Sequence, residues 1–296
     1  MSRGPSDALT AWLSEELGSI RSCTPCGWSA GRNRVWRVRR ENGDSFHAKV
    51  LGEDRAFRQE VEALRIWPAA LPARAAGLPR LIASQSALRA VLMTSVPGQS
   101  FLSAAAGAPG GRAGWRRAGE FLRDLRSLPH VDTDPLPLRD AIPARLELWL
   151  ERGGGEVTRE EGLLARRLVG DGALFRDRTR VACHRDFQPR NWIVSREGER
   201  LRLSIIDFEH SRPDHPLTDL IRVLGHVGTE RDPEFRELVG GLGLDRWADL
   251  VPEIRALTAV HAIGCIAWGV RHRDLPLSRQ GHALLARLGS GAEDSV

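Results

Sequence analysis

Apolar residues recur with two different periods along the first hundred residues. Leucines at positions 9, 13 and 17 follow helical spacing and predict a helix over residues 7–18. Alternating patterns then predict strands from Trp28 to Arg40 and from Ser45 to Leu51, joined by a tight turn at Asn42-Gly43, which tolerates positive φ. Three further elements are predicted here: a helix over 54–67 and strands over 80–84 and 89–94.

The pattern becomes mostly helical after Pro97-Gly98, which breaks the chain. Residues 99–114 are rich in glycine and alanine and are expected to form a loose connector. Beyond it an amphipathic stripe predicts a helix over residues 115–128. Other helices are expected at 141–152, 158–170, 216–227, 233–241, 253–270 and 279–288, and short strands at 181–183, 192–194 and 201–206.

These elements predict an α+β fold in two parts. Residues 1–96 would form a small β-rich lobe with one main helix, and residues 97–296 a larger, mainly helical lobe. A hinge is expected near Thr94 to Pro97. A chain of 296 residues is long enough for each part to have its own core.

Composition excludes several classes of protein. No uninterrupted apolar run approaches 18 residues, and the first residues lack the pattern of a secretory signal, so a cytoplasmic protein without a membrane partner is expected. Four cysteines do not make a disulfide scaffold, and Cys23 and Cys26, although spaced C-x-x-C, have no second pair to complete a zinc site. The net charge of +5 comes from interspersed acidic and basic residues without long basic runs, which argues against nucleic acid as a partner.

The basic residues are almost all of one kind. Of 43 basic residues, 42 are arginines and one is a lysine, Lys49. Only three asparagines occur, Asn33, Asn42 and Asn191, and there is no tyrosine. A GC-rich coding sequence explains the excess of arginine, so the single lysine and the few asparagines indicate positions where an arginine would not serve.

The segment from His184 to Asn191, His-Arg-Asp-Phe-Gln-Pro-Arg-Asn, has the H-R-D-x-x-x-x-N spacing of a kinase catalytic loop. In this pattern Asp186 would meet the acceptor hydroxyl, and Asn191 would offer a neutral oxygen to a metal ion. The apolar strand that follows ends at Asp207-Phe208-Glu209, where Asp207 would be the second metal ligand. The two metal ligands are separated by a hairpin expected around Ser195 to Arg200.

Lys49 has the position of a nucleotide-binding lysine, on a strand that precedes a helix bearing Glu60. Its compact ammonium would bind the α- and β-phosphates, where the wide fork of an arginine would not fit. A glycine-rich segment precedes this strand, and its small residues would let backbone amides approach phosphate. The phosphate-loop candidates are Ser29, Gly31 and Asn33.

With these motifs the chain resembles the aminoglycoside phosphotransferase and choline-kinase-like family of small-molecule kinases, over nearly its whole length. The resemblance implies a bilobal protein-kinase-like fold, ATP or GTP as donor and Mg2+ as cofactor. It implies that Lys49 and Glu60 form the nucleotide pair, with Thr94 and Val96 at the nucleotide-binding hinge. His184 and Asp219, the latter in Pro216-Leu217-Thr218-Asp219-Leu220, would support the catalytic loop structurally.

The protein kinases share the H-R-D motif but fit less well. Only 89 residues follow Asp207 (296 minus 207), no A-P-E-like segment is present, and Asp-Phe-Glu replaces D-F-G. A small-molecule acceptor is therefore expected. A catalytically inactive nucleotide-binding protein would usually lack one of Lys49, Asp186, Asn191 or Asp207, and all four are present.

The sequence predicts a Mg-dependent phosphotransferase that moves the γ-phosphoryl of ATP or GTP to a hydroxyl of a small molecule. The family and the GC-rich composition favour an antibiotic acceptor, either an aminoglycoside, a cyclic peptide or a nucleoside. A metabolic kinase acting on choline, homoserine or a sugar is the alternative. The candidate acceptor contacts are Glu209, Trp268 and Arg271. The choice between ATP and GTP, the acceptor and the oligomeric state stay open.

Overall fold

A computed structural model of the chain describes most of its residues. The described residues are 4–26, 33–72, 77–105, 111–130, 132, 134–227, 232–244 and 246–290. The chain divides into two compact units, the first formed by residues 1–117 and 188–212 and the second by residues 118–187 and 213–296. The predicted division into nucleotide and acceptor lobes at residues 96 and 97 stays a prediction.

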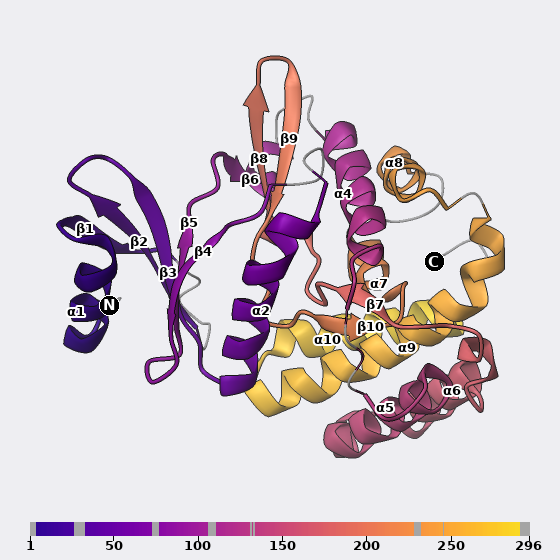
Figure 1. Cartoon of the computed structure of the whole chain (residues 1–296). Coiled ribbons are helices and arrows are strands. Elements are labelled where there is room, and N and C mark those ends of the chain that lie inside the picture. Colours follow the sequence, from indigo (N-terminus) through magenta and orange to yellow (C-terminus); the bar gives the residue numbers. More distant parts are fainter. Residues whose placement is uncertain are drawn as a thin grey trace. The chain divides into compact units, whose positions relative to one another are not determined.

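The first unit contains an antiparallel five-stranded sheet with the strand order β1-β2-β3-β5-β4 (Figure 1). Each strand is short, and β2 alternates between buried and exposed residues, as a strand covered on one face should. The five strands are β1 (Ile20–Pro25), β2 (Arg34–Arg40), β3 (Ser45–Val50), β4 (Leu81–Gln85) and β5 (Ala90–Thr94).

Helix α1 (Asp7–Leu17) covers one face of this sheet. Its buried residues, including Trp12 and Leu13, pack against Trp36, Ala48 and Leu92 in one hydrophobic core. Because neighbouring residues of a strand point to opposite faces, Lys49 and His47 lie on the other face of β3. The side chain of Lys49 is therefore on the face that α1 does not cover.

The rest of the first unit includes residues 188–212, which are distant in sequence from the N-terminal sheet. Strands β6, β8 and β9 form a second, three-stranded antiparallel sheet, and Phe101, Trp115 and Trp192 pack together with ring centroids 4.9–5.6 Å apart. Ser211 Oγ donates to the carbonyl of Gln59 at 3.3 Å, which ties the segment after β9 to α2. These elements are α2 (Asp54–Ala70), β6 (Gln99–Ser100), α3 (Phe101–Ala105), β8 (Trp192–Glu197) and β9 (Arg200–Ile205). Helix α4 (Gly111–Arg126) begins in the first unit and continues into the second.

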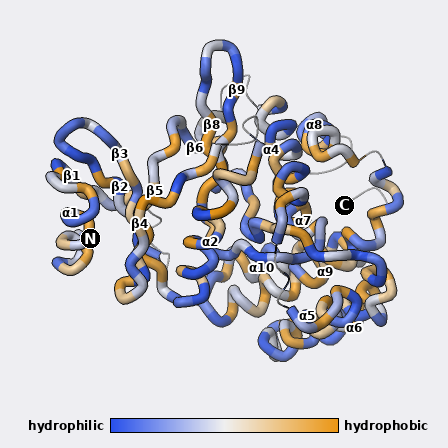
Figure 2. The backbone as a smooth tube through the Cα atoms, in the orientation of Figure 1, coloured by the Kyte–Doolittle hydropathy of each residue, from blue (hydrophilic) through white to orange (hydrophobic). Residues whose placement is uncertain are grey.

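The second unit is mainly helical, and its long helix α9 (Trp247–His272) packs against α5, α6 and α10. Figure 2 shows both hydrophilic and hydrophobic positions along these helices. Strands β7 and β10 form a two-stranded sheet, and β7 ends directly before His184. The other elements of this unit are α5 (Leu138–Gly153), α6 (Arg159–Val169), β7 (Val181–Cys183), β10 (Arg212–Asp214), α7 (Thr218–Val227), α8 (Pro233–Leu242) and α10 (Leu275–Gly289), with 3-10 turns at Gly154–Glu156, Ala173–Phe175 and, in the first unit, Pro189–Asn191.

One described helix, α9, is long and apolar enough to cross a membrane when length and composition alone are considered. Its best 18-residue window has a mean hydropathy of 1.4, although uninterrupted apolar runs are shorter. Within the protein, 67% of that window is buried. The apolar character of α9 is thus used for packing against its neighbouring helices.

Most expected elements exist, but several boundaries and small elements differ. The expected strand from Trp28 to Arg40 is shorter and begins at Arg34, while residues 27–32 lie outside the described part. The expected connector contains β6 and α3, and α4 begins earlier than residue 115. Strands β1 and β10 were not expected, because β1 reads Ile-Arg-Ser-Cys-Thr-Pro and has no clear alternation.

Candidate active site

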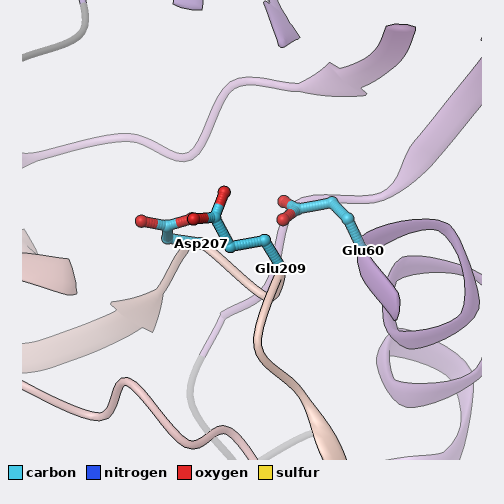
Figure 3. A group of neighbouring side chains, drawn as sticks. All are labelled: Glu60, Asp207 and Glu209. Carbon is cyan, nitrogen blue, oxygen red and sulfur yellow. The ribbon is translucent and has the colours of Figure 1, made fainter. Parts of the chain in front are cut away.

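Three carboxylates of the first unit converge on the ammonium of Lys49. Lys49 Nζ lies 2.8 Å from Glu60 Oε2, 2.5 Å from Asp207 Oδ1 and 2.9 Å from Glu209 Oε2. Lys49 is only 5% exposed and Glu60 1%. The carboxylates of Glu60, Asp207 and Glu209 point toward one another in Figure 3, and the three offer oxygens within 4.8 Å of each other.

The charged groups of this cluster change one another's pKa values. Burial alone would lower the pKa of Lys49, but Asp207, Glu60 and Glu209 together raise it well above its ordinary value, so the ammonium is charged. Burial raises the pKa of Glu60 to about 7 against the opposing effect of Lys49. Even without Glu60, the carboxylates of Asp207 and Glu209 outweigh the single positive charge of Lys49, and a bound cation would compensate the excess.

The backbone after β9 has an unusual conformation at Asp207, and the next residue anchors it to α2. Asp207 has φ of 75°, a left-handed conformation that is unusual for a residue with a side chain. Its neighbour Phe208 is buried and meets Trp67 of α2 edge to face, with ring centroids 5.3 Å apart. Because α2 also carries Glu60, the same helix that anchors this segment supplies the partner of Lys49.

Asn33 links the carboxylate cluster to the backbone at the end of β3. Its side-chain amide donates to Glu209, and its Oδ1 accepts from the amide of Gly52 at 3.0 Å. Asn33 thus lies beside the cluster, and its place in a phosphate loop stays a prediction. The other two phosphate-loop candidates, Ser29 and Gly31, lie outside the described residues.

Asn191 and Asp207 are placed at the same end of the β8–β9 hairpin. Trp192 pairs with Ile205, and the amide of Ile206 donates to the carbonyl of Asn191 at 3.1 Å. Asn191 lies directly before β8 and Asp207 lies two residues after the end of β9, so both candidate ligands are at the same end of the hairpin. Amide and carboxylate oxygens are the ligands that Mg2+ prefers. The excess negative charge and this all-oxygen donor set fit the metal ion that the sequence predicts.

The first residues of the catalytic-loop segment, His184 to Phe187, lie in the second unit and are held by Asp219. The carboxylate of Asp219 accepts from the backbone amides of His184 at 2.8 Å and Arg185 at 2.6 Å. The amide of Asp186 in turn donates to His184 Nδ1 at 3.2 Å. Burial raises the pKa of Asp219, although these amides and His184 act in the opposite direction. His184 and Asp219 thus accept hydrogen bonds from the backbone of this segment, and their supporting role stays a prediction.

A buried ion-pair network holds the same loop from a second direction. Arg145 donates to both oxygens of Asp214 at 3.0 and 3.1 Å, and Arg185 Nη1 lies 3.0 Å from Asp214 Oδ2. Burial alone would raise the pKa of Asp214, but the two guanidinium groups hold it far below its usual range. Arg185 itself has φ of 64°, so the loop keeps a strained backbone where its side chain is anchored.

Two residues beside Asp186 were not found from the sequence. Arg222 Nη1 of α7 lies 3.6 Å from Asp186 Oδ1. His261 of α9 is half-buried, and desolvation and the nearby Arg222 lower its pKa to about 3. Arg222 follows Asp219 by three residues on a helix, a spacing that could have placed it on the loop-facing side.

The remaining predicted site residues have varied surroundings. The amide of Thr94 donates to Arg80 and its hydroxyl accepts from Arg80, at 3.0 and 2.9 Å, while Val96 follows in an irregular segment. Glu209, expected at the acceptor, forms an ion pair with Lys49. Trp268 is 37% exposed and meets His272 with ring centroids 4.1 Å apart, and Arg271 is exposed in the last turn of α9.

Comparison with known proteins agrees with the class that this fold and these charged groups define. A model of the phosphotransferase enzyme family matches residues 27–257, which is most of the chain. The chain therefore belongs to the phosphotransferase enzyme family. A search of curated proteins finds no match.

Several solved structures share the fold at low sequence identity. The gentamicin complex of APH(2")-IIa has 17% identity and a TM-score of 0.69, with 97% of each chain covered. The GDP complex of aminoglycoside 2'-phosphotransferase-IIIa has 18% identity and a TM-score of 0.72, covering 94% of this chain and 96% of that one. A ternary complex of APH(4)-Ia with ADP and hygromycin B has 12% identity and a TM-score of 0.74, covering 96% and 99%.

These similarities confirm the predicted family and the α+β protein-kinase-like fold. The antiparallel N-terminal sheet and the helical C-terminal part match the expectation for that fold. The roles of individual site residues stay predictions, which the geometry of each unit now makes specific.

Proposed function

We propose that the protein transfers the γ-phosphoryl group of ATP or GTP to a hydroxyl group of a small molecule. The observation that carries this proposal is the cluster of Lys49, Glu60 and Asp207 in one unit. A buried lysine paired with a helix glutamate and a strand-end aspartate is the arrangement that binds nucleotide phosphates in kinases. Membership in the phosphotransferase family supports the same reaction class.

The chain's residues divide the work of phosphoryl transfer. Lys49 binds the α- and β-phosphates, with Glu60 orienting its ammonium. Asp186 orients the acceptor hydroxyl and accepts its proton as the oxygen attacks the γ-phosphorus. The bond from that phosphorus to the β,γ-bridging oxygen breaks, and the nucleoside diphosphate leaves with the bridging oxygen. Asp219 and Asp214 act only by positioning the loop.

Asn191 and Asp207 would hold Mg2+, and Glu209 joins them as a third candidate through its position beside Asp207. When bound, magnesium neutralises charge on the phosphate oxygens. Glu209 thereby moves from the predicted acceptor contacts to the phosphate side of the proposed site. Trp268 and Arg271 remain candidate contacts for the acceptor.

For the acceptor we propose an antibiotic, either an aminoglycoside, a cyclic peptide or a nucleoside, whose phosphorylation would confer resistance in the cytoplasm. The structures that share this fold include complexes with gentamicin and with hygromycin B, which supports an aminoglycoside as the first compound to test. A metabolic alcohol such as choline, homoserine or a sugar is the alternative, and the same assay tests it.

The test is a screen of hydroxylated antibiotics and metabolites with ATP and GTP, read by release of nucleoside diphosphate and by the mass gain of one phosphate group. Asp186→Asn should lower kcat by about 10²–10⁴-fold, the usual contribution of a positioned proton acceptor. Its nucleotide Kd should change less than about twofold, because Asp186 does not hold the phosphates.

The matched control is Asp177→Asn, which removes an exposed aspartate of the same unit and should leave turnover unchanged. Near-normal turnover of Asp186→Asn would contradict the assigned role. Nucleotide binding without transfer to any compound would favour a nucleotide-binding protein without catalysis.

A further inference from the structure

A polar group on the Lys49 face of β3 has no part in the function proposed above. His47 precedes Lys49 by two residues and therefore points to the same face of the sheet, about 7 Å away along the strand. Across the ladder His47 pairs with Arg37 on β2 and with Met93 on β5. The side chain of His47 is half-buried, beside the segment that follows β5.

His47 belongs to a short chain of hydrogen bonds. Its Nδ1 lies 3.0 Å from Ser95 Oγ, and Ser95 Oγ donates to Ser45 Oγ at 3.1 Å. Ser95 follows directly after β5, and its amide donates to the carbonyl of Ser45 at 3.4 Å. The imidazole is therefore held between the start of β3 and the end of β5.

The tautomer of His47 is set by how the hydroxyl protons of Ser95 and Ser45 are arranged. In the arrangement with Ser95 Oγ donating its single proton to Ser45 Oγ, Ser95 Oγ accepts from His47 Nδ1, and this is the tautomer on which the inference rests. Burial, with a smaller contribution from Arg37, lowers the pKa of His47, which keeps the ring neutral near pH 7. A neutral ring with its proton on Nδ1 has a hydrogen-bond acceptor at Nε2.

The nucleotide must extend from Lys49 toward His47. In the other direction β3 leads to Gly52, whose amide is bonded to Asn33, and Asn33 in turn is bonded to Glu209. That end of the strand holds the carboxylates and hence the phosphate and metal side. If Lys49 binds the α- and β-phosphates, the nucleoside lies toward the start of β3 and the end of β5.

We infer that His47, held by Ser95, contacts the donor base and makes the protein prefer ATP to GTP. The 6-amino group of adenine is a donor that matches the acceptor at Nε2, whereas the 6-oxo group of guanine would place two acceptors together. This inference rests on the proposed nucleotide site at Lys49 and adds a residue that determines which donor is used.

Titration calorimetry with ATP and with GTP, in the presence of Mg2+ and without acceptor, tests the inference. The wild-type protein should bind ATP at least about tenfold more tightly than GTP, the effect of one mismatched polar contact. His47→Leu, of similar size, should weaken ATP binding about tenfold and leave GTP binding within about twofold. The preference for ATP would then nearly disappear.

Ser95→Ala is a second variant, which removes only the hydroxyl group of Ser95 and keeps the imidazole of His47. Without Ser95 Oγ the proton of His47 is no longer held on Nδ1, and a ring with its proton on Nε2 can donate to guanine. The preference for ATP should fall at least about threefold, mainly because GTP binds more tightly. His130→Leu and Ser84→Ala change exposed residues of the same kinds and should leave both affinities unchanged.

The outcomes separate this inference from the proposed function. Equal binding of ATP and GTP by the wild type, tighter binding of GTP, or a ratio unchanged in both variants would overturn the role of His47 while leaving phosphoryl transfer intact. Absence of any nucleotide binding in folded wild-type protein would overturn both. A thermal unfolding curve for each variant confirms that it is folded before titration.

Discussion

Lys49 carries the only lysine ammonium in the chain, and three carboxylates contact it. A planar guanidinium needs a wider space than this buried group of oxygens offers, which gives a physical reason why one lysine persists among 42 arginines. The sequence could indicate Lys49, Glu60 and Asp207 because their spacing follows a known kinase pattern. It could not indicate that Glu209 joins them, since Asp-Phe-Glu alone does not fix where the glutamate points.

Glu60→Gln tests whether the buried carboxylate positions Lys49. The change keeps the shape of the side chain but removes the charge that orients the ammonium 2.8 Å away. We expect kcat/KM to fall about 10–100-fold, as when other supporting partners of a site are removed. The measurement is steady-state kinetics with the acceptor identified by the screen.

The control for Glu60→Gln is Glu62→Gln, two residues further along α2 on its exposed side. That variant should match the wild type. Equal kcat/KM for Glu60→Gln and the wild type would show that Glu60 has no positioning role.

At the scale of elements, the part of the catalytic-loop segment that lies in the second unit, His184 to Phe187, is fixed from two sides. Asp219 at the start of α7 binds its backbone, and Asp214 of β10 binds the side chain of Arg185. The role of Asp219 could be expected from its motif. The role of Asp214 could not, because Arg145 is 69 residues away from it and β10 is too short to give a periodic signal.

Asp214→Asn should make the protein less stable by about 3–5 kcal/mol near pH 7, because Arg145 and Arg185 lose their buried partner. The pKa of Asp214 is lowered in the folded state, so the folded protein binds fewer protons than the unfolded chain between the two pKa values. The stabilisation is therefore complete above about pH 4–5 and is lost as the pH falls further.

Urea unfolding of the wild type and Asp214→Asn at several pH values measures this effect. The wild type should lose stability below about pH 4 more steeply than the variant, so that the difference between them narrows. Asp177→Asn, at an exposed position, should follow the wild type. A constant difference across the whole pH range would show that the charge of Asp214 is not the stabilising factor.

At the scale of the whole molecule, periodicity identified the main helices and most strands, and motif spacing identified the family that the comparisons confirm. The unexpected result is how the chain divides. Residues 188–212, which carry Asn191 and Asp207, group with the N-terminal sheet and not with the helices around them in sequence. Hydrophobic patterns indicate local structure only, so they could not show that the β8–β9 hairpin belongs to the same unit as the N-terminal strands.

This grouping predicts that nucleotide and magnesium stabilise the protein together, because Lys49 and the candidate ligands Asn191 and Asp207 lie in the same unit. At a concentration of 100 times Kd, ATP with Mg2+ should add about 2.7 kcal/mol, which corresponds to a rise in Tm of about 4 °C for a chain of this length. ATP with a chelator should give a smaller rise, and Asp207→Asn should abolish the difference between the two conditions while Asp177→Asn keeps it. Thermal unfolding followed by circular dichroism provides the measurement, and equal rises in Tm with and without the chelator would contradict a metal site at Asp207.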